Sequence, residues 1–350
     1  MELLLAGAVA LATPPVAVAA PAPRAHCAVT DDDLGELSGM VVDGAGVVAV
    51  ADSGRRVELH LLGDALAGDD CAITDTRTVD VDPYDAEDLA RGPDGAVWVA
   101  DTGDNARRRD TVAVIVVPAD GEARLHRLSY PDGPHDAEAL LVDPQGRPVV
   151  VTKQVGSAGV YRTAAPPDGV GPTPLELVGT IALPPSSTQG GPIGGLGSRT
   201  VTGAAASADG RVVALRSYTD AWLYPAPDGD PVAALLGTGA PVQVPLPGEP
   251  QGEAIAFTPA GDLVSGSETR DGEPGEIRVV VGAAGLAAAV PPPRGTAPAP
   301  APTPDPAPDV VAEEDDGVPS PGLPAALGGA VVVGVLLAGI VAMSLPRRRR

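Results

Sequence analysis

The sequence predicts an all-β protein, specifically a β-propeller, and three observations lead to this fold class. A unit of two short apolar strands joined by a glycine turn recurs along the chain. The units recur at intervals of about fifty residues, a period typical of four-stranded propeller blades. The segment after the last unit is too short for a blade, but together with the segment before the first unit it makes about one further period. We therefore expect five blades, with a sixth, degenerate blade as the alternative.

Three positions define the repeated unit: an anchor residue, a turn glycine eight residues later and a third position six residues beyond the glycine. In one copy these positions are Glu87, Gly95 and Asp101. Two short strands joined by a tight glycine turn form a hairpin, so each copy predicts the two inner strands of a blade. The anchors are Ser38, Glu87, Glu138, Thr202 and Glu253, separated by 49, 51, 64 and 51 residues.

The other strands of each blade are expected from apolar or alternating segments between the units. Residues 27–37 are predicted to supply the outer strand of the last blade, because closing the ring in this way removes free sheet edges. The longest interval contains a glycine-rich loop, residues 186–198, and the sixth blade would lie in that interval. The expected third strands are 57–62, 111–117 and 276–281, and the expected outer strands are 122–130 and 174–183.

The two ends of the chain predict where the protein works. Residues 1–19 are an apolar run that ends in an A-x-A pattern, which is typical of a secretory signal peptide. After the propeller (27–290), the Pro/Ala-rich acidic segment 291–322 favours an extended stalk. Residues 323–345 carry no charge and are long enough for one transmembrane helix, and the arginine-rich tail 346–350 marks the cytoplasmic side. We expect a single-pass cell-membrane protein with an extracellular propeller and a cytoplasmic C-terminus.

Charge and cysteine content narrow the partners. The formal net charge is −23, which excludes nucleic acid as a partner and favours metal cations or an extracellular ligand or partner that is basic. Lys153 is the one lysine in the sequence. Cys27 and Cys71 both lie in the exported part, so a single disulfide between them is permitted, although the sequence does not give their separation.

The anchors are expected to meet at one mouth of the central channel. In a propeller the inner strand of each blade lines the channel, and its entry end shares a face with the loop between the second and third strands. Carboxylates crowded there need a counter-charge, which can be a hard cation such as Ca²⁺ or the basic side chains Lys153, Arg216 and Arg107. The third alternative is a wide, hydrated rim that needs no partner. The candidate metal ligands are Glu87, Glu138, Glu253, Asp85, Asp101, Asp104 and Asp136, and the candidate substrate-binding residues are Lys153, Arg216, Arg107 and His135.

Two segments resemble a known group of proteins. DAEDLA…GPDGAVWVADTGDN and HDAEALLVDPQGRPVVV are similar to blades of secreted bacterial β-propellers of the phytase-like, esterase-like group, and the resemblance covers residues 35–282. It implies Ca²⁺ at the channel mouth. It also implies that Lys153 and Arg216 face an anionic substrate. The ligands it implies are Glu87, Glu138, Glu253, Asp101 and Asp104.

Two functions remain open at this point. The first is an extracellular binding or scaffold module with a cation at the channel mouth, which the stalk and the anchor support. The alternative is a calcium-dependent hydrolase of phosphoesters, in which a metal-held water attacks and basic residues stabilise the developing charge. The sequence contains no G-x-S-x-G nucleophile elbow, so a hydrolase of that type is not indicated.

Overall fold

The structure, a computed structural model, describes residues 20–288 except 45, 64, 69 and 170. The expected signal peptide (1–19), stalk (291–322), membrane span (323–345) and tail (346–350) lie outside the described residues and stay predictions. Among the described helices, none has the length and apolar character needed to cross a membrane.

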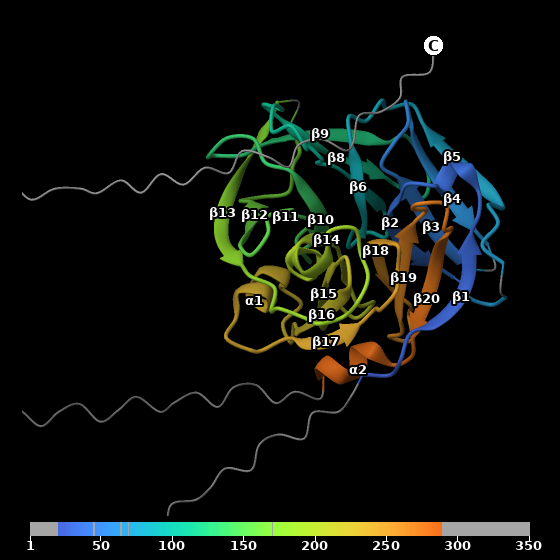
Figure 1. Cartoon of the computed structure of the whole chain (residues 1–350). Helices are drawn as coiled ribbons and strands as arrows, with labels where there is room; N and C mark the ends of the chain where they lie inside the picture. The colour runs from blue at the N-terminus through green and yellow to red at the C-terminus, as the bar shows by residue number, and fades with distance from the viewer. Residues whose placement is uncertain (1–19, 45, 64, 69, 170, 289–350) are drawn as a thin grey trace, which may run out of the picture. The chain divides into compact units, whose positions relative to one another are not determined.

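The described residues form twenty strands and two short α-helices, and the strands assemble in antiparallel groups of four that we call blades (Figure 1). Each of the first two blades runs from an inner to an outer strand in chain order. One consists of β2 (Leu37–Asp43), β3 (Gly46–Ala51), β4 (Val57–Leu62) and β5 (Asp75–Val79). The next consists of β6 (Ala86–Arg91), β7 (Val97–Asp101), β8 (Val112–Val117) and β9 (Arg124–Ser129).

The following blades repeat this order. The third group consists of β10 (Ala137–Val142), β11 (Pro148–Thr152), β12 (Ala158–Thr163) and β13 (Thr173–Ile181). Its outer strand β13 also pairs in parallel with β9, which joins the second and third groups in one eight-stranded sheet. The fourth consists of β14 (Val201–Ala206), β15 (Val212–Ser217), β16 (Asp220–Pro225) and β17 (Val242–Pro245). The last contains β18 (Gln251–Phe257), β19 (Leu263–Glu268) and β20 (Gly275–Val280), and β1 (Arg24–Val29) is its fourth strand.

The N-terminal strand closes the ring, as the sequence predicted. β1 pairs antiparallel with β20, from Arg24 opposite Val279 to Val29 opposite Gly275. This strand begins before the expected segment 27–37, whose second half instead forms the short 3₁₀ helix η1 (Asp32–Leu34). The N-terminal strand β1 and the C-terminal strands β18 to β20 form one sheet, so β1 covers the edge of β20 that would otherwise be unpaired.

The inner strands lie next to one another around the centre. β2 contacts β6, β6 contacts β10, β10 contacts β14, β14 contacts β18, and β18 contacts β2. Figure 1 shows these strands at the centre and β1, β5, β9, β13 and β17 at the periphery. The described residues between β13 and β14 form no strand, and part of the glycine-rich loop forms the 3₁₀ helix η2 (Gly194–Arg199). The all-β propeller predicted from the repeats is confirmed.

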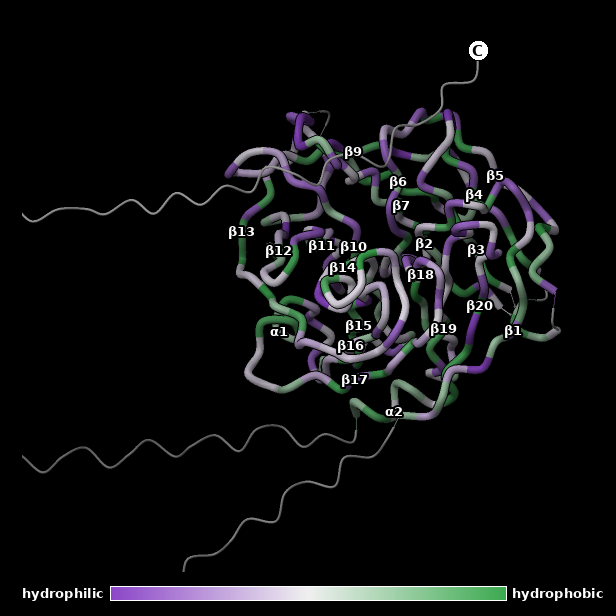
Figure 2. Tube along the Cα trace, in the orientation of Figure 1, coloured by the Kyte–Doolittle hydropathy of each residue, from purple (hydrophilic) through white to green (hydrophobic). Residues whose placement is uncertain are grey.

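Apolar residues fill the spaces between neighbouring blades. Val41 and Val50 of one blade pack in one cluster with Leu89, Val99 and Ile115 of the next, and all five are buried. Figure 2 shows hydrophobic colour along both short helices, α1 (Pro231–Leu236) and α2 (Ala283–Ala288), which the sequence analysis did not predict. Blade-to-blade burial of this kind makes the ring a single core and holds the inner strands in fixed positions.

A buried carboxylate ties three inner strands together below the channel mouth. Asp88 Oδ2 accepts the backbone N–H groups of Leu140 at 2.8 Å and Ala204 at 3.1 Å, and Oδ1 accepts that of Leu89 at 2.8 Å. These donors lie on β10, β14 and β6. On the other side, a Cβ at Gly39 would lie 2.6 Å from the Asp88 backbone, so glycine there lets β2 pack directly against β6.

A disulfide joins Cys27 of β1 to Cys71, which lies in the loop between β4 and β5. The two Cα atoms are 5.5 Å apart, within the usual range for a disulfide. Both residues are buried in the cluster that also contains Leu34 and Met40. The bond therefore links the closing strand to the blade that follows it around the ring.

Candidate metal centre

Every anchor residue of the sequence repeat is a β-bulge. In β6 the pairing with β7 passes from Ala86 to Asp88 and skips Glu87, and in β10 it skips Glu138 in the same way. A bulge directs the extra residue out of the regular alternation and is common next to active sites. The skipped residues are Ser38, Glu87, Glu138, Thr202 and Glu253, and all of them are buried.

The two anchors with hydroxyl groups fasten neighbouring blades. Ser38 Oγ donates to the backbone carbonyl of Glu87 at 2.6 Å and lies 3.2 Å from Glu87 Oε2. Thr202 Oγ1 donates to the carbonyl of Gly252 at 2.9 Å. Ser38 and Thr202 therefore hold the bulged ends of the next inner strands, and the acidic anchors are left to form the site.

Three carboxylates from two adjacent blades converge at the mouth. One oxygen each from Glu87, Asp136 and Glu138 lies within 4.8 Å of the others, and all three residues are buried. Asp136 is held by the backbone N–H of Asp104, which donates to its Oδ1 at 2.8 Å. Oxygen ligands at this spacing suit a hard divalent cation, so these residues fit a metal site.

Lys153 supplies the positive charge at this cluster. Its ammonium group forms an ion pair with Glu138 and lies 5.5 Å from the centroid of the Tyr218 ring. The backbone N–H of Lys153 donates to the carbonyl of Asp136 at 2.9 Å, which fixes the start of its loop next to the acids. The side chain is 20% exposed, so it lies at the boundary between the cluster and solvent.

Burial and mutual repulsion shift the pKa values of these groups. Burial, then the charge of Glu138, raise the pKa of Glu87 well above its ordinary value. Burial also raises the pKa of Glu138, and the nearby Lys153 opposes this rise. For Lys153 burial alone would lower the pKa, but the charges of Glu138 and Glu253 outweigh it and raise the pKa. One cation among several buried carboxylates leaves the cluster short of positive charge.

Glu253, the third acidic anchor, lies on β18 and outside the three-carboxylate cluster. Its Oε1 accepts a hydrogen bond from the Gln251 side-chain amide at 3.1 Å, and its Oε2 is buried without a hydrogen-bond partner in the described part of the chain. Burial raises the pKa of Glu253 to about 8, and the charge of Lys153 opposes this rise. A second acidic group, Glu268, ends β19, and burial and the charge of Asp52 raise its pKa to about 7.

Asp85 lies beside the metal-ligand candidates. Burial and the charge of Asp136 raise its pKa to about 6, while Arg109 opposes the rise. A Cβ at Gly103 would overlap both the Asp85 carboxylate and Glu87 Oε1. The residue after Thr102 is therefore glycine because the acidic side chains occupy the space that a methyl group would fill.

The carboxylates of Asp101 and Asp104 bind groups of the loop that follows β7. Asp101 pairs with Arg109 at 3.0 Å and accepts the backbone N–H groups of Tyr84 and Asp85, each at 3.1 Å. Asp104 Oδ2 accepts the backbone N–H groups that follow it, from residues 108 and 109, at 2.6 and 2.7 Å. Both carboxylates order the 102–111 loop around the mouth, and the structure does not bring them into the three-carboxylate cluster.

The remaining substrate-binding candidates lie away from the cluster. Arg216 is fully buried and forms an ion pair with Glu249, so it does not face solvent at the mouth. Arg107 is exposed in its loop and has a positive φ of 50°. His135 Nε2 lies 3.0 Å from Asp132 Oδ1 and 3.0 Å from the Tyr161 hydroxyl, between two blades.

Several contributors were not assigned a role from the sequence. Glu249, Gln251 and Glu268 flank the last anchor, and Arg109 braces the loop after β7. Asp52 occupies the third position of the first repeat, the same place that Asp101 holds in the second. This equivalent position in the repeat is the sequence feature from which Asp52 could have been predicted as a site residue. Nothing in the sequence marked Glu249, which lies between β17 and β18 and whose partner Arg216 lies on β15.

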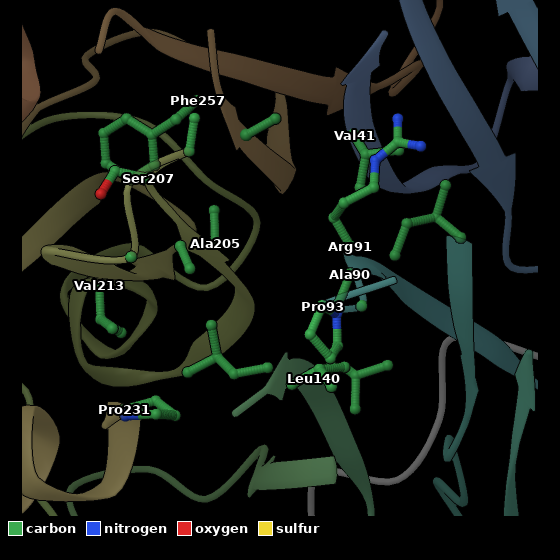
Figure 3. Close-up of a pocket in the computed structure, with 18 of the residues that line it drawn as sticks. Val41, Ala90, Arg91, Pro93, Leu140, Ala205, Ser207, Val213, Pro231 and Phe257 are labelled. Atoms are coloured by element: carbon green, nitrogen blue, oxygen red, sulfur yellow. The ribbon is translucent and has the colours of Figure 1, made fainter. Parts of the chain in front are cut away.

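A cavity lies at the ends of the inner strands opposite to the acidic anchors. It has a volume of about 410 Å³ and is lined by residues from all the inner strands, including Leu89, Leu140 and Phe257. Figure 3 shows Leu140 and Phe257 among the labelled side chains around this cavity, with Arg91 and Ser207 as the labelled polar residues. The acidic anchors are absent from its lining. The channel thus has one acidic end and one largely apolar end.

No protein-family model matches the chain, and no curated protein sequence matches it. Among solved structures, a gluconolactonase from Xanthomonas campestris is 18% identical, with a TM-score of 0.38, over 75% of this chain and 88% of that one. A PQQ-bound aldose sugar dehydrogenase from Streptomyces coelicolor is 11% identical, with a TM-score of 0.38, over 76% and 99%. A glutaminyl cyclase from Myxococcus xanthus is 13% identical, with a TM-score of 0.38, over 74% and 94%. These likenesses concern the fold alone. Fold and site together define a β-propeller with a buried acidic cluster at one end of its channel.

Proposed function

We propose that this protein is a cell-surface propeller of five blades that binds one divalent cation at the acidic end of its channel and acts as an extracellular binding module. The convergence of Glu87, Asp136 and Glu138 within 4.8 Å carries the proposal. Because all three ligands are carboxylates, Ca²⁺ is the expected cation. The ring of five inner strands supports the blade number.

The location rests on the ends of the sequence. The segment 1–19 supports export, 291–322 supports a stalk, and 323–345 followed by 346–350 supports a single membrane anchor with a cytoplasmic tail. The strongly acidic charge supports an extracellular partner that is basic or that binds through the cation. A propeller displayed in this way would present its channel mouths to extracellular ligands.

Calorimetric titration of the full-length protein with Ca²⁺ tests the proposal, together with thermal unfolding in Ca²⁺ and in chelator. We expect saturable binding of one ion and an increase in unfolding free energy of about 2.7 kcal/mol when free Ca²⁺ is a hundredfold above Kd. Glu87→Gln and Glu138→Gln should each abolish binding, whereas Glu58→Gln, on the exposed face of β4, should bind normally. Wild-type protein that neither binds Ca²⁺ nor gains stability would refute the metal centre.

A second candidate function is hydrolysis of phosphoesters, and the state of Glu253 favours it. Among the described residues, one buried oxygen of Glu253 has no hydrogen-bond partner, and its pKa of about 8 is a value suited to a general base near neutral pH. In this reading Glu253 takes a proton from the attacking water and Lys153 stabilises negative charge on the substrate. A bound cation would supply Lewis-acid activation of the phosphoryl oxygens.

Hydrolysis of a generic phosphomonoester by the full-length protein separates the two functions. Turnover that depends on Ca²⁺ and falls at least a hundredfold in Glu253→Gln would establish the hydrolase. Cation binding with no turnover on mono- or diesters would favour the binding module. Turnover that survives both chelator and Glu87→Gln would exclude this site as its source.

A further inference from the structure

The carboxylate of Glu253 leaves one hydrogen-bonding position vacant. The residue is 3% exposed, its Oε1 accepts from Gln251, and its Oε2 is buried without a partner in the described residues. A buried carboxylate oxygen without a donor is costly, and native proteins leave few of them. The arrangement therefore points to a donor from outside the chain.

Glu268 lies on the same side of the mouth. It pairs with Gln251 in the register between β18 and β19, so its side chain emerges beside the residue that holds Glu253. The following residue, Thr269, donates its backbone N–H to the carbonyl of Gly35 at 3.0 Å. This bond brings the end of β19 against the segment that precedes β2.

Asp52 completes a group of three acids at this position. Its backbone N–H donates to the carbonyl of Glu36 at 3.0 Å, next to the bond that Gly35 makes with Thr269. Asp52 Oδ1, like Glu253 Oε2, is buried without a hydrogen-bond partner in the described region. Two unpartnered acceptors from different blades thus lie at the same part of the mouth.

The basic side chains nearby are committed to other partners. Lys153 pairs with Glu138, and Arg216 pairs with Glu249. Arg270 donates to the Gln251 side-chain oxygen at 2.5 Å and lies 3.6 Å from the carboxylate of the next residue. None of these cations donates to Glu253 Oε2 or to Asp52 Oδ1. Both vacant positions are therefore on acidic side chains to which none of these cations donates a hydrogen bond, although the charges of Lys153 and Arg216 act on Glu253.

The spacing favours a ligand larger than a metal ion. Within the described residues, the carboxylates that come close enough to share an ion are those of Glu87, Asp136 and Glu138. Glu253, Glu268 and Asp52 do not converge in that way, so one ion could not satisfy them together. A flat or branched donor group with several N–H bonds can reach separated carboxylate oxygens.

We infer that Glu253, Glu268 and Asp52 form a binding site for an organic cation, whose ammonium or guanidinium group donates hydrogen bonds to these carboxylates. The site is distinct from the proposed metal centre because it uses other side chains, none of which belongs to the cluster of Glu87, Asp136 and Glu138. It assigns a chemical class to the ligand of the channel mouth: a small aliphatic amine or guanidine, or a larger molecule that carries one.

Calorimetric titration of the full-length protein with cadaverine and with agmatine tests this inference, with pentanediol as the neutral probe. We expect at least one of the two cations to bind in chelator and in Ca²⁺, and pentanediol not to bind. Glu253→Gln, Glu268→Gln and Asp52→Asn should each weaken binding about tenfold or more. Glu58→Gln, an exposed glutamate of β4, is the matched control and should bind as the wild type does.

The variants also separate this site from the metal centre. Glu87→Gln should lose Ca²⁺ binding and retain amine binding, whereas Glu268→Gln should do the reverse. If Glu253→Gln does not fold by circular dichroism, Glu268→Gln decides, because Glu268 is only half-buried. Failure of both cations to bind wild-type protein, unchanged binding in a folded Glu268→Gln variant, or equal binding of pentanediol would each overturn the inference.

Discussion

Lys153 pairs with Glu138 across one β-hairpin, so the cluster of acids at the channel mouth carries its own cation. Glu138 is the bulged residue of β10, and Lys153 directly follows β11, the strand with which β10 pairs. The same carboxylate is a ligand in the proposed metal centre. A divalent ion and the ammonium group therefore compete for Glu138.

Replacing Lys153 with methionine should strengthen cation binding. The ammonium group no longer competes, and the site gains one unit of negative charge, so we expect about a tenfold lower Kd for Ca²⁺. Titration at about pH 8.5 measures the change, because a higher pH favours the deprotonated form of the ligands. Lys153→Arg keeps the positive charge and should leave the affinity close to that of the wild type. Weaker Ca²⁺ binding in Lys153→Met would show that the lysine supports the ion instead of opposing it.

The stability of the protein in chelator should fall as pH rises from 5 to 8. The folded-state pKa values are raised from 4.5 to about 8 for Glu253, from 4.5 to about 7 for Glu268 and from 3.8 to about 7 for Asp52. A carboxyl group with a raised folded-state pKa stabilises the fold below its ordinary pKa, and this contribution is lost as pH rises through the raised value. Unfolding free energy measured against urea at several pH values should show the decline.

The slope of the unfolding free energy against pH identifies the carboxyl groups that titrate. A group that holds a proton in the folded state but not in the unfolded state changes the unfolding free energy by up to about 1.4 kcal/mol per pH unit. Glu268→Gln removes one such group, so the plot of unfolding free energy against pH should be flatter near pH 6. Hydrogen bonds from neighbouring groups lower the pKa values of Asp132 and Asp209 below the ordinary value of 3.8. Their contributions to the unfolding free energy therefore change at acidic pH and not between pH 5 and 8. A stability profile that is flat or rises between pH 5 and 8 would contradict the raised pKa values.

Alanine at position 103 should damage the metal centre without replacing any ligand residue. Its methyl group would overlap Glu87 Oε1 and the Asp85 carboxylate, so one of the acids must move. We expect Ca²⁺ affinity to fall about tenfold or more, because metal sites tolerate little displacement of their ligands. Gly239→Ala is the control, since a Cβ there meets no atom within 4 Å. Equal Ca²⁺ affinity in the two variants would place the ion elsewhere.

Asparagine at position 88 should weaken the fold. Both carboxylate oxygens of Asp88 accept backbone N–H groups, from Leu89 on one side and from Leu140 and Ala204 on the other. An amide would turn one oxygen into an NH₂ group that faces donors, so we expect a loss of about 3 kcal/mol in unfolding free energy. Asp43→Asn, exposed at the end of β2, should change it by less than about 0.5 kcal/mol. Denaturant midpoints for the two variants provide the comparison.

The repeat was readable from the sequence because propeller blades repeat a local pattern. Apolar strands on either side of a turn glycine recur at regular offsets, and the inner hairpins appear where the pattern placed them, for instance β6 and β7 around Gly95. The closing strand was also predicted, since a short last unit needs its missing strand from elsewhere. Its start at Arg24 was missed, because the alternation there is weak and the pairing with β20 determines it.

The candidate site was only partly readable. Glu87, Glu138 and Asp136 were named and do converge, because equivalent positions of neighbouring blades lie side by side. Asp101 and Asp104 were named for the same reason, yet their own loop binds them through Arg109 and backbone N–H groups. Arg216 was assigned to the mouth by its place in the repeat, but Glu249 draws it into the interior.

The sequence by itself determined the fold class, the inner hairpins and the surplus of acidic residues at one end of the channel. These follow from local periodicity and composition, which need no knowledge of distant contacts. The tertiary structure decided that the anchors are bulges, that Lys153 pairs with Glu138, and that Glu253 Oε2 and Asp52 Oδ1 lack donors in the part of the chain that the structure describes. Those facts depend on how residues from different blades share charge and hydrogen bonds, and such long-range pairing leaves no pattern along the chain.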